Sequence, residues 1–294
     1  MTSLPARSLL LAAAALGACA TVPRLASAPT CPSDAAVAEV ARLYLALEKL
    51  PAPPAEMTLD GASCGQAKLM AALGPALGKP IGYKAGLTNP AVQKRFGIDR
   101  PLLGTLLEKM VVREGAPIPA RLGVRPFLEA DLVVEVGSSA IHEATTPEQA
   151  LASLRAIYPF IELPDVTLDD PSRITAPSLT YYDVGARLGV LGKPLPVAGS
   201  AGLAEALRTM TVRTTDGAGK ELASGPGSAI LGHPLQAVIW LAGELKRQGA
   251  TLRPGDLLSL GAFSAGAIQA GATVRVTYEG LPGNPSVQVT FPGS

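Results

Sequence analysis

Two acidic residues stand two positions apart in an alternating segment near the middle of the chain. Glu129 and Asp131 belong to residues 127–136 (FLEADLVVEV), in which every second residue is apolar. Side chains two apart on a strand leave the same face, so the two carboxylates should lie close together. Like charges repel unless a cation separates them, and oxygen ligands suit Mg²⁺, Mn²⁺ or Ca²⁺. A half-exposed strand that turns both acids to water remains the alternative.

A third acid interrupts an otherwise apolar stretch. Glu162 lies within residues 158–164 (YPFIELP). Burying a carboxylate without a partner costs free energy. Glu162 should therefore lie at the mouth of a pocket, bind a cation, or face solvent on an edge strand. With Glu129 and Asp131 it completes a candidate set of three metal ligands.

Two further segments could bind an anionic group of a ligand. Lys84 lies in residues 82–88 (GYKAGLT), at the end of a short predicted strand and before a glycine turn. A lysine among small apolar residues can bind an anionic substrate, although a surface lysine is the alternative. Residues 223–229 (ASGPGSA) form a Gly-rich loop before a helix, which exposes backbone N–H groups. A simple connection is the alternative for this loop.

Composition and missing motifs exclude several functions. Lys and Arg number 25 against 24 Asp and Glu, a net charge of +1 that argues against a nucleic-acid partner. The two histidines, His142 and His233, and the lack of a cysteine pair at metal spacing argue against zinc. Neither a phosphate-binding loop, a dinucleotide fingerprint nor a G-x-S-x-G elbow occurs.

The elements that must position these residues follow from apolar periodicity and turn signals. Helices are predicted over residues 34–50, 61–77, 89–97, 146–158 and 234–247. Strands are predicted over residues 81–85, 127–136, 160–163, 210–214, 220–224, 257–262, 272–278 and 286–291. The strand-rich second half indicates an α+β domain with a mixed, mainly antiparallel, rolled β core and surrounding helices.

The N-terminus resembles an export signal rather than part of the fold. Arg7 precedes an apolar stretch, residues 8–16, that is too short to span a bilayer. The following residues, ending at Cys19, resemble the lipobox of bacterial lipoproteins. We therefore predict a signal peptide at 1–18, lipidation of Cys19, a tether at 19–32 and a folded domain at 33–294. An ordinary signal peptide cleaved near Ala28 is the alternative. Either implies a periplasmic protein, with membrane contact only through a lipid anchor; a cytoplasmic chain without export is the remaining alternative.

The remaining cysteines fit an oxidising compartment. Cys31 and Cys64 form an even pair, each near the start of a predicted helix. They could form a disulfide that joins the two helices, or remain two unrelated buried thiols.

Four motifs in order carry a family resemblance: Gly82–Thr88, Phe127–Asp131, Phe160–Glu162 and Gly225–Pro234. Together they make residues 34–292 similar to the fumarylacetoacetate hydrolase superfamily, in its 2-keto-4-pentenoate hydratase and oxalocrotonate decarboxylase branch. The resemblance implies the C-terminal β-roll of that superfamily, homo-oligomers and a hydratase-like catalytic domain at 33–294.

The resemblance also implies roles for individual residues. A divalent metal, Mg²⁺ or Mn²⁺, is expected on Glu129, Asp131 and Glu162, with Lys84 and Glu162 in catalysis. The expected substrate is a small 2-oxo or 2-hydroxydienoic carboxylic acid, which the metal would hold as its enolate. The expected substrate contacts are Lys84, Leu87, Ser224, Gly225 and Ser228. Hydration, decarboxylation and C–C hydrolysis all remain open at such a site.

Three departures from the family pattern bear on function. Asp131 stands where Glu is more usual, and the segment after Glu162 (LPDVT) lacks an Arg often found in cytoplasmic hydratases. Asp183 falls near a position that often holds Asn in this branch. An exported protein that binds a small acid without turnover is therefore the alternative to a lyase.

Overall fold

The structure, a computed structural model, describes residues 31–293 except 120 and 198–201. The predicted signal peptide, Cys19 and nearly all of the predicted tether lie outside these residues. The α-helices are α1 (Asp34–Leu45), α2 (Leu59–Leu77), α3 (Pro90–Arg95), α4 (Pro147–Ala152), α5 (Ala176–Tyr181), α6 (Leu203–Thr209) and α7 (Pro234–Arg247). The strands are β1 (Pro80–Gly86), β2 (Leu102–Leu107), β3 (Val111–Arg113), β4 (Phe127–Val136), β5 (Leu154–Leu163), β6 (Leu188–Leu191), β7 (Leu195–Pro196), β8 (Thr211–Asp216), β9 (Glu221–Pro226), β10 (Leu257–Ser259), β11 (Ser264–Ala267), β12 (Thr273–Glu279) and β13 (Ser286–Thr290).

Two sheets form the β core of the described residues. The larger follows the order β2-β1-β10-β4-β5-β6-β3, and β11 and β7 pair with β4 and β5 outside that path. Only its β1–β10 and β3–β6 pairs are parallel among the described strands. The smaller sheet is antiparallel, in the order β13-β12-β8-β9. The predicted α+β class with a mainly antiparallel, rolled core is confirmed.

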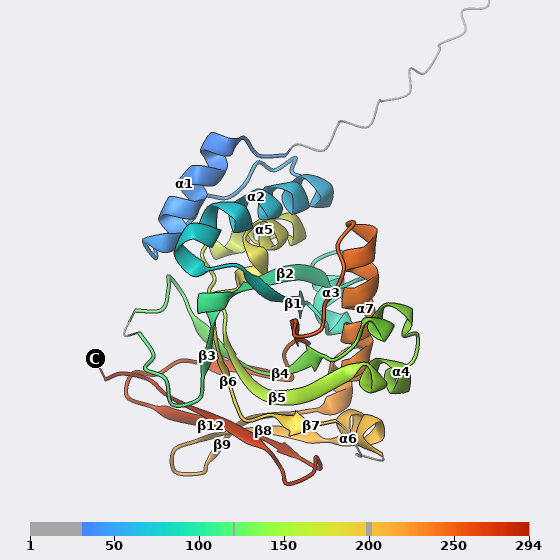
Figure 1. The fold of residues 1–294 in the computed structure, drawn as a ribbon. Helices are drawn as coiled ribbons and strands as arrows, with labels where there is room; N and C mark the ends of the chain where they lie inside the picture. The colour runs from blue at the N-terminus through green and yellow to red at the C-terminus, as the bar shows by residue number, and fades with distance from the viewer. Residues whose placement is uncertain (1–30, 120, 198–201, 294) are drawn as a thin grey trace, which may run out of the picture.

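Helices cover the curled sheet on separate sides (Figure 1). Helices α1, α2 and α5 form a layer over one end, α7 and α4 run along one flank, and the four-stranded sheet lies opposite the helical layer. The largest apolar cluster lies between the sheets and α7, and a second fills the helical layer. Within the described part of the chain, no helix has the length and apolar character needed to cross a membrane.

Strand β5 differs most from the prediction. We expected a helix to run to Tyr158 and a strand to begin at Phe160, but α4 ends at Ala152 and β5 runs from Leu154 to Leu163. The apolar and aromatic side chains of this segment pack better in a central strand, where Ile157 pairs with Val134 of β4. The full-length β5 sets the register that brings Glu162 opposite β4.

Helix α1 and strand β10 are also shorter than predicted. Helix α1 ends at Leu45 because Leu47 is left-handed, at φ 57°, and Leu50 forms a bridge with Leu168. Strand β10 ends at Ser259 because Gly261 adopts φ +109°, which extended backbone does not allow.

A buried tyrosine ties the two sheets together beneath the acidic residues. Tyr278 of β12 is fully buried, and its hydroxyl donates to the backbone carbonyl of Asp131. The same oxygen accepts from the backbone N–H of Phe160 at 3.0 Å. Adjacent positions of β4 and β5 are thereby held from the smaller sheet.

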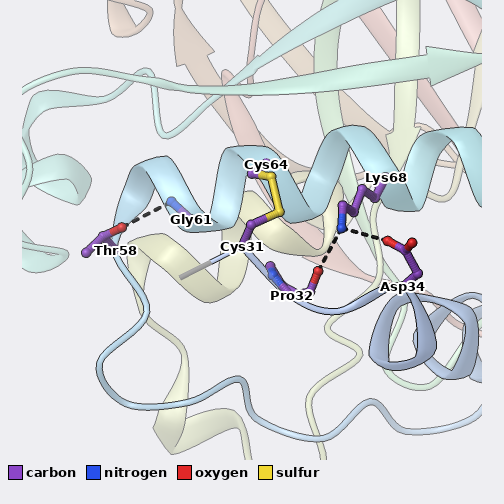
Figure 2. Close-up of a disulfide and its surroundings, with 7 residues drawn as sticks. All are labelled: Cys31, Pro32, Asp34, Thr58, Gly61, Cys64 and Lys68. Carbon is purple, nitrogen blue, oxygen red and sulfur yellow. Dashed lines mark hydrogen bonds and ion pairs between the residues drawn. A yellow bond between two sulfur atoms is a disulfide. The ribbon is translucent and has the colours of Figure 1, made fainter. Parts of the chain in front are cut away.

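A disulfide joins the start of the described chain to α2 (Figure 2). Cys31 and Cys64 are bonded, with Cα atoms 5.5 Å apart. Lys68, one turn along α2, donates to the carbonyl of Pro32 at 3.1 Å and to Asp34 at 2.6 Å. The structure thus favours the bonded alternative, in which the residues before α1 are fastened to α2.

Removing this disulfide should destabilise the protein measurably. Replacing Cys31 and Cys64 together by Ser should lower the free energy of unfolding by about 3 kcal/mol, because the bond restricts the unfolded chain. Urea unfolding of oxidised wild type and variant measures the difference. Dithiothreitol should bring the wild type to the variant's midpoint and leave the variant unchanged. Equal midpoints under oxidising conditions would contradict the bond.

Candidate active site

The three predicted metal ligands lie on one face of the β4–β5 pair. Glu129 is directly opposite Glu162 in the antiparallel register, and Asp131 follows two residues along the same face. Asp131 is 0% exposed and Glu162 3%, while Glu129 is half-buried. The alternative in which these acids face water is therefore wrong for Asp131 and Glu162.

The predicted lysine reaches the same face from the neighbouring part of the sheet. Lys84 of β1 is 3% exposed, forms an ion pair with Oε1 of Glu162, and donates to the carbonyl oxygen of Val184 at 3.2 Å. Its partner in β2 is Gly104, where a Cβ atom would lie 2.5 Å from Cγ of Lys84. The absence of a side chain at Gly104 therefore leaves room for the Lys84 side chain beside β2.

Asp131 is held in place by donors from the segment around β10. Oδ2 accepts from the hydroxyl of Ser259, and Oδ1 accepts from the N–H of Gly261 at 2.8 Å and of Leu132 at 2.5 Å. The left-handed backbone at Gly261 aims its N–H at the carboxylate, and a side chain there would collide with Thr88.

Burial of several carboxylates together shifts their proton affinities. Burial, and then repulsion from Glu162, raises the pKa of Glu129 to about 8 despite the attraction of Lys84. The same two causes raise the pKa of Asp131 to about 7, against the lowering effect of Ser259. For Lys84, burial lowers the pKa, but Glu162 and the other acids outweigh it and raise the pKa overall. One ammonium thus faces three carboxylates.

This donor set is chemically suited to a divalent cation. Buried carboxylate oxygens without nitrogen or sulfur are the ligands that Mg²⁺ and Mn²⁺ prefer, and a cation would compensate their excess negative charge. In the present arrangement, however, no three acidic, His or Cys side chains of the described residues surround a common point. Asp131 is engaged by Ser259 and Glu162 by Lys84, so the side chains would have to turn to bind a metal together.

A cavity of about 330 Å³ opens beside this cluster. Lys84, Glu129 and Glu162 lie at its polar side, and the predicted substrate residue Leu87 lines it. The rest of its lining is mostly apolar, from Val92, Phe127, Pro164, Leu179, Val184 and Phe263. Asp131 lies behind the cavity rather than in its wall.

Three residues of the Gly-rich loop that were expected to contact substrate lie outside this cavity. Ser224, Gly225 and Ser228 are absent from the described cavity wall. Ser224 and Gly225 continue β9, pairing with β8, and the Ser224 hydroxyl donates to Glu221. Gly225 instead allows close approach of the Phe263 carbonyl, so this segment supports the wall from behind.

A strained turn beside Lys84 carries residues whose place in the site was not predicted. Asp183, Val184 and Gly185 are all left-handed, at φ 54°, 53° and 69°. A β-branched residue in this region costs about 1–3 kcal/mol, so surrounding contacts must hold it. Asp183 is fully buried, and burial raises its pKa to about 7 despite hydrogen bonds from Thr105 and Gln66. No periodicity in the sequence marks these contacts; Asp183 stood out only as a departure from the family pattern.

Comparisons with known proteins place this geometry in a family. No family model matches the chain. The chain is 33% identical over 217 residues to a 2-keto-4-pentenoate hydratase of Burkholderia vietnamiensis, covering 72% of this chain and 78% of that protein. It is 28% identical over 214 residues to a 2-hydroxyhexa-2,4-dienoate hydratase of Comamonas testosteroni, covering 71% and 78%.

A solved structure shares the fold. The 4-oxalocrotonate decarboxylase of Pseudomonas putida G7, complexed with magnesium and adipate, superposes with a TM-score of 0.76 at 23% identity, covering 88% of this chain and 97% of that one. This likeness concerns the fold alone, whereas the Burkholderia vietnamiensis hydratase is close enough in sequence and coverage to show the family. The chain belongs to the 2-keto-4-pentenoate hydratase family of hydro-lyases.

Proposed function

We propose that this protein adds water to a small 2-hydroxydienoic acid of the 2-hydroxypenta-2,4-dienoate type, giving a 4-hydroxy-2-oxo acid. The observation that carries the proposal is the Lys84–Glu162 pair, buried at one side of an apolar cavity with Glu129 beside it. Membership of a hydratase family supports the same reaction. The cavity has room for an acid of this size.

The proposed roles follow from what each group can reach. Lys84 is the single cationic side chain among the described residues that line the cavity, so the substrate's negative charge should lie toward it. Its ammonium would stabilise the charge that develops on the 2-oxygen as the dienol loses its hydroxyl proton. Glu162, in contact with Lys84, is placed to accept that proton.

We further propose that Glu129, Asp131 and Glu162 hold a divalent metal, Mg²⁺ or Mn²⁺. Bound there, the metal would act as a Lewis acid on the oxygens at the carboxylate end of the substrate. Ser259 and Gly261 would orient Asp131 for this purpose. Support comes from the buried excess of negative charge.

The proposal for localisation is export to the periplasm, with Cys19 carrying a lipid. The Cys31–Cys64 bond supports it, because disulfides persist in oxidising compartments and are rare in the cytosol. The metal-supported cavity would then act on acids outside the cytoplasm.

Turnover should depend on a divalent metal and on Glu162. With Mg²⁺ or Mn²⁺, the purified protein should consume 2-hydroxypenta-2,4-dienoate, measured as loss of its ultraviolet absorbance. EDTA should abolish turnover, and Mn²⁺ should restore it. Glu162→Ala should lower kcat at least about 100-fold. If the acid raises the melting temperature without being consumed, the protein is a binder rather than an enzyme.

The metal-free protein should lose stability as pH rises from about 5 to 8. The folded chain keeps protons on Glu129 and Asp131, whose pKa values are about 8 and 7, after the unfolded chain has released them. Folding therefore binds protons in this window, so the free energy of unfolding falls with pH. Melting temperatures at fixed ionic strength check the slope. The double variant Glu129→Gln, Asp131→Asn should reduce the slope and leave the part that comes from Asp183, whose pKa is also about 7; an unchanged slope in that variant would reject this origin.

The cavity should prefer substrates in which the end remote from the carboxylate is uncharged. Apart from Lys84, no Lys, Arg or His of the described chain lines it, so a second carboxylate would lie unpaired against apolar side chains. We expect kcat/KM to be at least about 100-fold lower for an analogue that carries a second carboxylate at the far end of the chain than for 2-hydroxypenta-2,4-dienoate itself. Leu179→Lys should narrow the gap, whereas the size-matched Leu179→Met should preserve it. Equal rates for both acids with wild-type protein would refute this preference.

Lipidation should be detectable through Cys19. In a bacterial host, the full chain should partition with membranes and incorporate labelled fatty acid, whereas Cys19→Ser should do neither. The Cys31→Ser, Cys64→Ser variant serves as the control and should keep the label. Recovery of unlabelled wild type in the cytosol would contradict both export and lipidation.

A further inference from the structure

A buried amide links the helical layer to the strained turn. Gln66 of α2 is polar but only 6% exposed, and the buried residues of the helical layer around it are largely apolar. Its Nε2 donates to the carbonyl of Leu103 at 2.7 Å and to Oδ1 of Asp183 at 2.8 Å. Both hydrogens of the amide are therefore used, one on β2 and one on the turn.

Asp183 is gripped from two elements at once. Besides Gln66, the backbone N–H of Thr105 donates to the same Oδ1 at 2.8 Å. Oδ2 is buried and has no hydrogen-bond partner among the described residues. The carboxyl group is thus used as an acceptor on one oxygen, which fixes the position of a left-handed backbone.

The left-handed turn at residues 183–185 also positions the side chain of Lys84. Directly after Asp183, the carbonyl of Val184 accepts from Lys84 Nζ at 3.2 Å, and Lys84 has only Glu162 as its other hydrogen-bond partner in the described chain. The Val184 side chain lies against Gly86, which leaves no space for a Cβ atom. The Lys84 side chain is therefore closely surrounded, and its ammonium has one charged acceptor, Glu162, and one neutral acceptor, the Val184 carbonyl.

We propose that Gln66 and Asp183 are positioning residues for Lys84, acting through the Val184 carbonyl. Neither side chain lines the cavity. Gln66 holds Asp183, Asp183 holds the left-handed turn, and the turn aims the ammonium at Glu162 and the substrate. This inference rests on the proposed function for its kinetic readout, and it also has one that needs no turnover.

A double-mutant cycle tests the linkage. Gln66→Leu should lower kcat at least about 10-fold with little change in KM, because the lysine acts on bound substrate. In a Lys84→Ala background, the same substitution should have almost no further effect. Equal fold-losses in both backgrounds would show that Gln66 does not act through Lys84.

Variants at Asp183 and Met70 separate positioning from stability. Asp183→Asn retains an acceptor oxygen and should keep most of kcat, whereas Asp183→Leu should lose it. Met70→Ala, a buried change on the same helix, should lower the melting temperature and leave kcat unchanged. An Asp183→Asn variant as impaired as Asp183→Leu, or a Met70→Ala variant as impaired as Gln66→Leu, would overturn the proposal.

Chemical labelling gives the readout that does not depend on activity. In wild type, Lys84 should react slowly with an acylating reagent, as followed by peptide mass spectrometry. Gln66→Leu should raise this rate several-fold, and Met70→Ala should not. If no acid is turned over but these rates differ as expected, the proposed reaction fails while the positioning role stands. Identical rates would end the positioning role.

Discussion

The structure depends on one electrostatic constraint, which is the placement of two buried carboxylates and one half-buried carboxylate beside a single ammonium. Such a cluster is tolerated only if protons, hydrogen bonds or a cation offset the repulsion. Lys84 compensates Glu162, donors from Ser259 and Gly261 compensate Asp131, and burial raises the pKa of Glu129. The remaining imbalance supports the proposal that this face of the sheet serves chemistry rather than packing.

The fold supplies rigid supports for that cluster from every side. Strands β4 and β5 carry the acids in register, and Tyr278 of β12 fastens both backbones from the smaller sheet. On the opposite side, α2 reaches the lysine through Gln66 and Asp183, and the disulfide fastens α2 to the residues before α1. The groups proposed to contact substrate therefore lie on strands, and their positions are set by contacts with helices and with the second sheet.

The sequence predicted the acids better than their surroundings. Alternation within β4 placed Glu129 and Asp131 on one face correctly, because a strand's period is a local property. Glu162 was recognised as unusual locally, but its place opposite Glu129 depends on the register of β5, whose start was misassigned. Ser224 was expected at the pocket because the family resemblance implied it, whereas strand pairing places it in β9 opposite Arg213. The role of Asp183 depends on partners far away in sequence, and no local pattern reports such contacts.

The position of β10 in the sheet has a consequence for how the protein matures. This strand comes from residues 257–259, yet it lies between β1 and β4, with Ser259 paired to Lys84 on one side and Val133 on the other. Within the described sheet, no strand other than β10 pairs with both the lysine strand and the acid strand. A chain that ends before residue 257 would therefore contain the proposed catalytic groups Lys84 and Glu162 without the strand that joins β1 to β4. Contacts between such distant segments form slowly, so competence should arrive late and all at once.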